Sequence, residues 1–220
     1  MKVKRLFAAQ IIVLVVTLFS TMNVYGEHKD NIYIRINLWT NELIVSKNNE
    51  VIKRFSIASG TEESPTPIGL FKVEEKSKSW GGGFGTRWLG LNVPWGQYGI
   101  HGTNKPNLIG KNVSGGCIRM QNKDVESLFE LIPTGTMVYI EGPVTGKGKG
   151  EFKNLALGSK GNLVQLVQHR LKTIGLYDGI EDGIYGISTE RAVKRFQKIN
   201  HFPLTGAVTV REYVLLGLLE

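Results

Sequence analysis

One cysteine and one histidine, both in glycine-rich surroundings, carry the residue types needed for nucleophilic catalysis. Cys117 is the only cysteine of the chain, and it follows His101 by sixteen positions. A thiol reacts as its thiolate, and at an ordinary pKa of about 8.5 only a small fraction is ionised at neutral pH. A nearby imidazole raises that fraction and can later protonate a leaving amine. The pair therefore makes the chain a candidate cysteine enzyme.

The residues on either side of Cys117 suit the same chemistry. Gly115 and Gly116 let the backbone approach a substrate closely and turn its N–H groups toward a developing oxyanion. Arg119 is placed to hold a carboxylate. Each feature also has an ordinary explanation: a small buried thiol, a structural histidine, a tight turn or a solvated charge. The combination indicates a cysteine enzyme more strongly than any one of its parts.

Composition bounds the class of protein. The 220 residues are 41% hydrophobic and 21% charged, which excludes a wholly disordered chain and a polytopic membrane protein. The net charge of +8 falls to +5 without residues 1–26, because three of the 27 basic and none of the 19 acidic residues lie there. The remaining positive residues are scattered, which argues against nucleic-acid binding. A lone cysteine excludes an internal disulfide and a zinc site built of cysteines.

The first 26 residues have the layout of a secretory signal peptide. Met1–Arg5 is basic, residues 6–19 are mostly apolar, and Gly26 is a small residue suited to cleavage. The alternative is an uncleaved N-terminal anchor, because the apolar stretch extended to Val24 nearly reaches the about 20 residues of a membrane span. Both alternatives predict a protein that acts outside the cytoplasm. Exported thiols are usually paired, so an unpaired Cys117 is expected to be reactive.

The rest of the chain divides into a β-rich region, a linker and a helical region. Strict alternation over residues 32–38 predicts a half-buried strand, and turns at Thr40-Asn41 and Asn48-Asn49 predict hairpins. Further strands are expected at residues 43–45, 51–57, 68–73, 88–93, 98–101 and 137–140. A helix over residues 125–132 is closed by Pro133. Residues 142–150 contain four glycines and a proline, which is typical of a linker.

After the linker the apolar residues follow a helical period. Leu163, Val167, Leu171 and Ile174 form one stripe, and Ala192, Val193, Phe196 and Ile199 form a second. Thr209 with Glu212 three residues on predicts a capping box that begins a third helix. Residues 151–219 therefore predict a small all-α three-helix bundle, of the size of a binding module.

The motifs of the β-rich region resemble those of the YkuD-type L,D-transpeptidase family. The resemblance covers residues 31–141 and rests on Thr66–Phe71, Gly82–Gly85, Tyr98–Thr103 and Ser114–Met120. It implies a β-sandwich catalytic domain with Cys117 as the nucleophile at the end of a cleft and His101 as the base. It also implies that no metal or cofactor is needed.

Other residues follow the family pattern, with one departure. Ser114, Gly116 and Arg119 match it, whereas Gly115 stands where the family often has a histidine. The resemblance implies that a backbone carbonyl, that of Gly102 or Thr103, orients the base. Trp80, Trp88 and Trp95 flank these motifs, where they would either form a wall or lid that limits water or pack as ordinary core residues.

The helical region resembles the three-helix peptidoglycan-binding domain. The matching segments are Leu157–Gly161, Asp178–Gly186 and Thr189–Gln197. Together the two resemblances imply an exported enzyme that acts on peptidoglycan stem peptides, forms 3→3 cross-links through a cysteinyl thioester and holds the wall polymer with its helical domain. Two alternatives are an L,D-carboxypeptidase, in which water resolves the thioester, and a non-catalytic wall-binding protein. Cell-wall cysteine peptidases that place cysteine before histidine fit less well, because His101 precedes Cys117 here.

Overall fold

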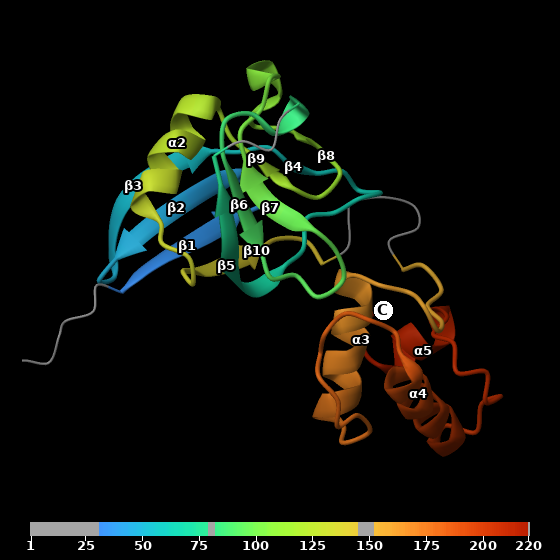
Figure 1. Ribbon diagram of the computed structural model, residues 1–220. Helices are drawn as coiled ribbons and strands as arrows, with labels where there is room; N and C mark the ends of the chain where they lie inside the picture. Colours follow the sequence, from blue (N-terminus) through green and yellow to red (C-terminus); the bar gives the residue numbers. More distant parts are fainter. Residues whose placement is uncertain (1–30, 79–81, 145–151, 220) are drawn as a thin grey trace, which may run out of the picture. The chain divides into compact units, whose positions relative to one another are not determined.

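The computed structural model describes residues 31–78, 82–144 and 152–219. The predicted signal or anchor over residues 1–26, Trp80 and most of the predicted linker lie outside the described residues. Within the described residues, a β-rich domain precedes a helical domain, which is the expected fold class (Figure 1). A search of the described helices finds none with the length and apolar character of a membrane span.

Eight strands of the first domain form one curled sheet (Figure 1). They are β1 (Ile32–Asn37), β2 (Glu42–Lys47), β3 (Glu50–Ser56), β5 (Gly69–Ser77), β6 (Trp88–Leu91), β7 (Tyr98–His101), β9 (Ile118–Arg119) and β10 (Met137–Glu141). Their order is β3-β2-β1-β10-β5-β6-β7-β9, with the β1–β10 and β7–β9 pairs parallel. Two further strands, β4 (Ser59–Gly60) and β8 (Asn112–Ser114), pair in parallel beside it. Short 3₁₀ turns lie at Gly82–Phe84 and Pro106–Leu108.

The hairpins form where the alternating pattern predicts them. Ile34 and Ile36 of β1 are fully buried, whereas Arg35 between them faces solvent. The turn between β2 and β3 places Asn48 and Asn49 at φ 52° and 68°. Positive φ at both central residues is the type I′ geometry whose twist matches the strands it connects, and asparagine tolerates it. The predicted hairpin turn is therefore confirmed.

One helix packs against the strands that carry the predicted site. Helix α2 (Asn122–Leu131) contacts β6 and β7 and buries Val125, Leu128 and Phe129 on the sheet. It begins three residues earlier than the apolar period indicates, because its first turn is polar. It ends before Pro133, as predicted. The same core contains Ile100 of β7 and Ile118 of β9.

The second domain consists of α3 (Asn162–Thr173), α4 (Ile187–Ile199) and α5 (Val210–Leu215). The capping box between Thr209 and Glu212 is present as predicted, with the Thr209 N–H donating to the Glu212 carboxylate at 2.8 Å. Two residues of the predicted stripes are not in the core: Ile174 is 51% exposed and Ile199 is 64% exposed. Ile174 follows the last turn of α3, and Ile199 is the last residue of α4, so both lie at helix ends, beyond the core.

Two fully buried glutamines organise the loops of the helical domain in the same way. The Gln168 amide donates to the Ile184 carbonyl, and its oxygen accepts the Gly183 N–H at 2.8 Å. The Gln197 amide donates to the Ala207 carbonyl, and its oxygen accepts the Gly206 N–H at 2.9 Å. Both glycines have φ of +68°.

The glutamine bonds show that the domain contains the same arrangement twice: a helix whose buried glutamine bonds to the loop that follows. The sequence alone did not reveal this repeat. Each repeat places a buried amide on a helix and uses it to satisfy the backbone of the loop that follows. A buried polar side chain in such a position replaces secondary structure as the partner of loop backbone groups.

One side chain of the helical domain bonds to the backbone of the β-rich domain. The Asn162 amide donates to the Thr66 carbonyl at 3.1 Å, and its oxygen accepts the Ile68 N–H at 3.1 Å. Asn162 is buried, so both bonds are sheltered from water. This contact ties the start of α3 to the segment that enters β5.

Replacing either glutamine is expected to destabilise the helical domain. Gln168→Ala and Gln197→Ala each leave buried loop N–H and C=O groups without partners, at a cost of about 1–3 kcal/mol per group. Chemical denaturation followed by circular dichroism should show both losses. The exposed Arg191 on α4 provides the control, because Arg191→Ala should change the free energy of unfolding by less than about 0.5 kcal/mol. Equal stability of the glutamine variants and the wild type would contradict this account.

Candidate active site

The parallel pairing of β7 with β9 brings the predicted nucleophile and base to one face of the sheet. Ile100 lies opposite Ile118 and His101 lies opposite Arg119. Side chains alternate along strands, and the two isoleucines point into the core. His101 and Arg119 therefore share the other face, together with Cys117, whose thiol takes part in a hydrogen bond with the Gly99 backbone.

The backbone before Cys117 is closed into a tight loop by Ser114. The Ser114 hydroxyl donates to the Cys117 carbonyl at 2.6 Å and accepts the Gly116 N–H at 3.1 Å. Gly116 has φ of +108°, and a Cβ there would lie 2.6 Å from Cε1 of Tyr98. Only glycine fits both the backbone conformation and the space. Ser114 and Gly116 thus fix the position of the nucleophile.

Gly115 differs from Gly116 in that nothing confines it. It is exposed, its φ is not in the left-handed region, and a Cβ there would meet no atom within 4 Å. The structure has room at this position for the histidine that the family pattern often carries there.

Burial determines the protonation of Cys117. Desolvation raises the pKa of the half-buried thiol above its ordinary value, and the Gly99 backbone and the positive charge of Arg119 offset part of that rise. The thiol is therefore protonated at neutral pH, and it needs a base before it can attack.

His101 has the properties of that base. Burial lowers the pKa of its imidazole, and the Arg119 charge lowers it further, against the carbonyls of Gly102 and Phe84, which raise it. The imidazole is thus neutral at neutral pH. Its Nδ1 lies 2.5 Å from the Gly102 carbonyl, which can only accept, so Nδ1 carries the proton. Nε2 is left with the lone pair that can take a proton.

Of the two carbonyls named from the sequence, that of Gly102 contacts the base. Thr103 is buried, and its hydroxyl accepts the Lys105 N–H at 3.1 Å. Gly102 is close-packed, because a Cβ there would lie 2.2 Å from the Asn122 side-chain oxygen. Asn122 is the first residue of α2, so the start of this helix packs against Gly102.

A tryptophan lies beneath the imidazole. The Trp88 and His101 rings stack at 5.7 Å with an angle of 26°, and Phe84 meets the same imidazole edge-on at 4.9 Å. The Trp88 indole N–H donates to the Glu75 carboxylate at 3.0 Å. With 2% of its surface exposed, Trp88 packs in the interior and does not form a lid.

Sequence reasoning named Trp88 only as a neighbour of the motifs, and it missed Glu75 and Asn122. Pairing between β5 and β6 brings Glu75 opposite Gly90, near the indole. Local sequence patterns do not predict that β5 pairs with β6 in this register. Trp95 is half-buried and meets Phe71 edge-on at 6.1 Å, so it too packs against the core.

Arg119 is held by its backbone and contributes charge. Its N–H and carbonyl each bond to Ala58 at 2.8 Å. Its side chain is half-buried, and its charge acts on both His101 and Cys117. Binding of a substrate carboxylate by Arg119 remains a prediction. Across the described ranges, no group of three or more His, Cys, Asp or Glu residues could hold a metal ion.

Comparison with known proteins gives two family matches. Residues 31–140 match the YkuD model, the L,D-transpeptidase catalytic domain, and residues 160–212 match the model described as "Putative peptidoglycan binding domain". The chain is 45% identical over 108 residues to "Putative L,D-transpeptidase YkuD" of Bacillus subtilis, covering 49% of this chain and 65% of that protein. It is 42% identical over 123 residues to "Putative L,D-transpeptidase YqjB" of the same organism, covering 49% and 70%.

Solved structures include similar chains. The NMR structure of the catalytic domain from Enterococcus faecium L,D-transpeptidase is 25% identical and covers 52% of this chain and 99% of that chain, with a TM-score of 0.45. This chain spans 65% of the length of the YkuD protein of Bacillus subtilis.

The two adjacent glycines allow a matched test of the nucleophile loop. Gly116→Ala forces a Cβ into Tyr98 and strains a positive φ, so the thiol is displaced. A displacement of about 1 Å costs about 100-fold in rate. Acylation of Cys117 by a carbapenem, followed by mass spectrometry, should slow by that order, whereas Gly115→Ala should stay within about threefold of the wild type. Equal effects at both positions would contradict the geometry.

The charge of Arg119 predicts a shift in the titration of the base. The wild-type His101 pKa should lie below the ordinary 6.5, because burial and Arg119 both disfavour the imidazolium. Removing the positive charge in Arg119→Gln should raise the His101 pKa and also raise the pKa of Cys117. NMR titration of the imidazole carbon and iodoacetamide alkylation of the thiol against pH measure the two. The exposed Lys111→Gln serves as a control and should shift neither group.

Proposed function

The chain belongs to the YkuD L,D-transpeptidase family, and we propose that it is an exported enzyme that cross-links peptidoglycan stem peptides through a thioester on Cys117. The observation that carries the proposal is the shared face of β7 and β9. There a neutral thiol and a neutral imidazole whose Nε2 carries no proton occupy one side of the sheet. This is the arrangement that base-assisted attack by a thiol requires.

The first half-reaction forms the thioester. His101 Nε2 takes the thiol proton as Cys117 Sγ attacks the carbonyl carbon of the third residue of a donor stem. The C–N bond to D-Ala then breaks, and the imidazolium gives its proton to the departing D-Ala amine. A neutral resting pair means that no charge is separated until the substrate is in place. Stacking on Trp88 then favours the transient imidazolium, because an aromatic face attracts a cation.

The second half-reaction resolves the thioester. An amine on the side chain of a neighbouring stem attacks the thioester carbonyl, His101 takes the amine proton, and the thiolate leaves and is reprotonated. The product is a 3→3 cross-link. If water replaces the amine, the same intermediate gives a trimmed stem, which is the carboxypeptidase alternative.

Fewer backbone N–H groups are available to stabilise the oxyanion than the sequence predicts. The Gly116 N–H is already bonded to the Ser114 hydroxyl, so it is not available to a tetrahedral intermediate. The amide of Cys117 itself has no partner among the described hydrogen bonds. We assign the oxyanion contact to the Cys117 N–H, which the Ser114 bond to the Cys117 carbonyl helps to orient.

Two further elements of the proposal concern location and partners. The basic and apolar layout of residues 1–26 supports export, either with cleavage of the signal or with its retention as an anchor. The match of residues 160–212 to a peptidoglycan-binding model supports the wall polymer as the partner of the helical domain. Arg119 is the proposed contact for the carboxylate of the leaving D-Ala.

Product analysis tests the proposal. Purified protein is incubated with a disaccharide-tetrapeptide muropeptide, and the products are separated by mass. We expect a cross-linked dimer and one released D-Ala per cross-link. Cys117→Ala should give neither, whereas the Gly115→Ala control should give both.

Two outcomes would change the assignment. Released D-Ala without a dimer would show a hydrolase acting through the same thioester. Activity in the Cys117→Ala variant would show that the nucleophile is wrong.

A further inference from the structure

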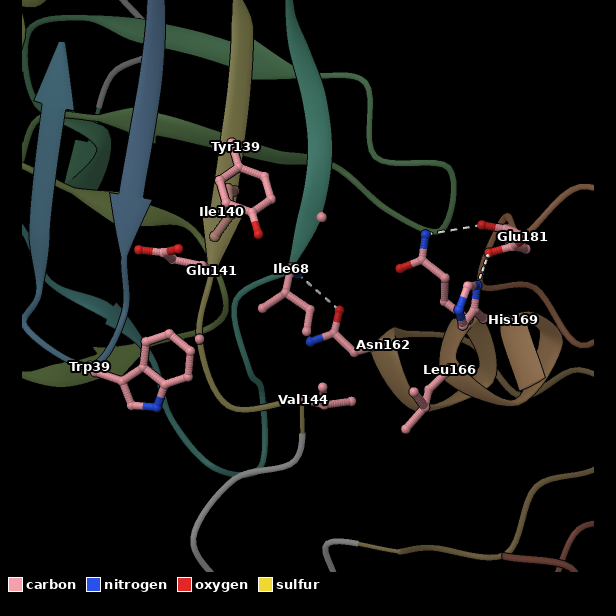
Figure 2. A pocket seen from close by; sticks show the side chains of 13 residues that line it. Trp39, Ile68, Tyr139, Ile140, Glu141, Val144, Asn162, Leu166, His169 and Glu181 are labelled. Atoms are coloured by element: carbon pink, nitrogen blue, oxygen red, sulfur yellow. Dashed lines mark hydrogen bonds and ion pairs between the residues drawn. The ribbon is translucent and has the colours of Figure 1, made fainter. Parts of the chain in front are cut away.

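A pocket of about 360 Å³ lies apart from Cys117 and His101, where the edge of the sheet meets α3. Figure 2 shows its walls: Trp39 and Tyr139 come from the sheet side, and Leu166 and His169 come from the helix. Its volume is within the range of small-ligand sites. No step of the proposed reaction uses it.

The helical wall is a second face of α3. Asn162, Gln165, Leu166 and His169 recur at intervals of three and four residues, so they lie along one side of the helix. Val164, Val167 and Leu171 point into the domain core from the other side. One side of α3 therefore packs into the core of the helical domain, and the other side lines the pocket.

The sheet wall carries exposed aromatic surface. Trp39 is 60% exposed and Tyr139 is 46% exposed, although both are large side chains whose burial would be favourable. Contiguous exposed apolar surface is a common feature of ligand-binding grooves. Flat aromatic faces offer C–H contacts to the apolar faces of sugar rings, while their polar atoms stay at the edge.

The charges that line the pocket are already neutralised. The Glu141 carboxylate is paired with Arg35 at 2.7 Å. The Glu181 carboxylate is paired with His169 at 2.9 Å (Figure 2). It is also paired with Lys172 at 3.4 Å. These pairs hold acceptor oxygens in fixed positions without a net charge, which suits hydroxyl and amide N–H donors better than ions.

We propose that this pocket binds an uncharged saccharide unit of a glycan strand, with the sugar ring against Trp39 and Tyr139 and its hydroxyl or acetamido groups against the acceptors of Glu141 and Glu181. The inference rests on the proposed function in taking the wall polymer as the partner. The site is built by both domains, so the isolated helical domain lacks its aromatic wall.

Binding is measured on the full chain in a Cys117→Ala background, so that catalysis does not enter the result. The probe is chitotetraose, an uncharged oligomer of N-acetylglucosamine, titrated against intrinsic tryptophan fluorescence and backbone NMR shifts. We expect saturable binding, with shifts at α3 and β10. Trp39→Ala and Tyr139→Ala should each weaken it at least about tenfold, whereas Tyr139→Phe, which keeps the ring, should stay within about threefold.

Controls separate this site from a general loss of structure. Leu204→Ala, at another exposed apolar residue, should leave the affinity unchanged. Thermal melting of every variant checks the fold. Absence of chitotetraose binding, or equal affinity in the wild type and both alanine variants, would overturn the proposal. So would displacement of chitotetraose by the free stem tetrapeptide, because the pocket would then be a peptide site. A failure of D-Ala release in the product assay would leave these binding results unaffected.

Discussion

Parallel pairing of β7 with β9 is the constraint on which the active site depends. It sets Ile100 opposite Ile118, and burial of that pair fixes which face the neighbouring residues occupy. A slip of one residue would send His101 or Cys117 into the core, because side chains alternate along each strand. Two short strands thus determine the geometry of the candidate site, and the large sheet and α2 supply the packing that keeps their register.

Around His101 and Cys117, close packing and burial set the orientation and protonation that charged side chains set in many catalytic sites. The third member of the set is a backbone carbonyl, and Gly102 can present it only because it lacks a Cβ next to Asn122. Burial, and not an acidic partner, sets the protonation of both reacting groups. Both reacting groups are therefore neutral at rest, and the positive charge of Arg119 lowers the pKa of each as a smaller contribution.

The sequence predicts the elements with long, regular patterns and misses those that depend on distant contacts. Alternation identifies β1, and the helical period identifies α3 and α4, although the same period wrongly predicts that Ile174 and Ile199, at the helix ends, are buried. Strands β4, β8 and β9 are two or three residues long, too short for any period to show. The residues of the site follow from motif spacing and family resemblance.

What the sequence lacks is the supporting structure: the Glu75–Trp88 bond beneath the imidazole, and the bond that removes the Gly116 amide from the oxyanion site. These depend on strand pairing and on loop closure across many residues. The buried glutamines of the helical domain are a similar case, because a polar residue in a helix gives no sign of facing inward.

The segment from Pro65 to Ile68 lies between the candidate active site and the proposed saccharide pocket. The Thr66 hydroxyl accepts the Gly60 N–H at 2.9 Å, and the Pro65 carbonyl lies 3.3 Å from where a Cβ of Gly116 would be. On its other side, the same segment is held by Asn162 of the helical domain and lines the pocket through Ile68. The segment therefore lies next to the loop that contains Gly116 on one side and next to α3 and the pocket on the other. Hydrogen bonds at Thr66 and Ile68 hold this segment between them, so it is the physical link between the pocket and the loop that contains Gly116.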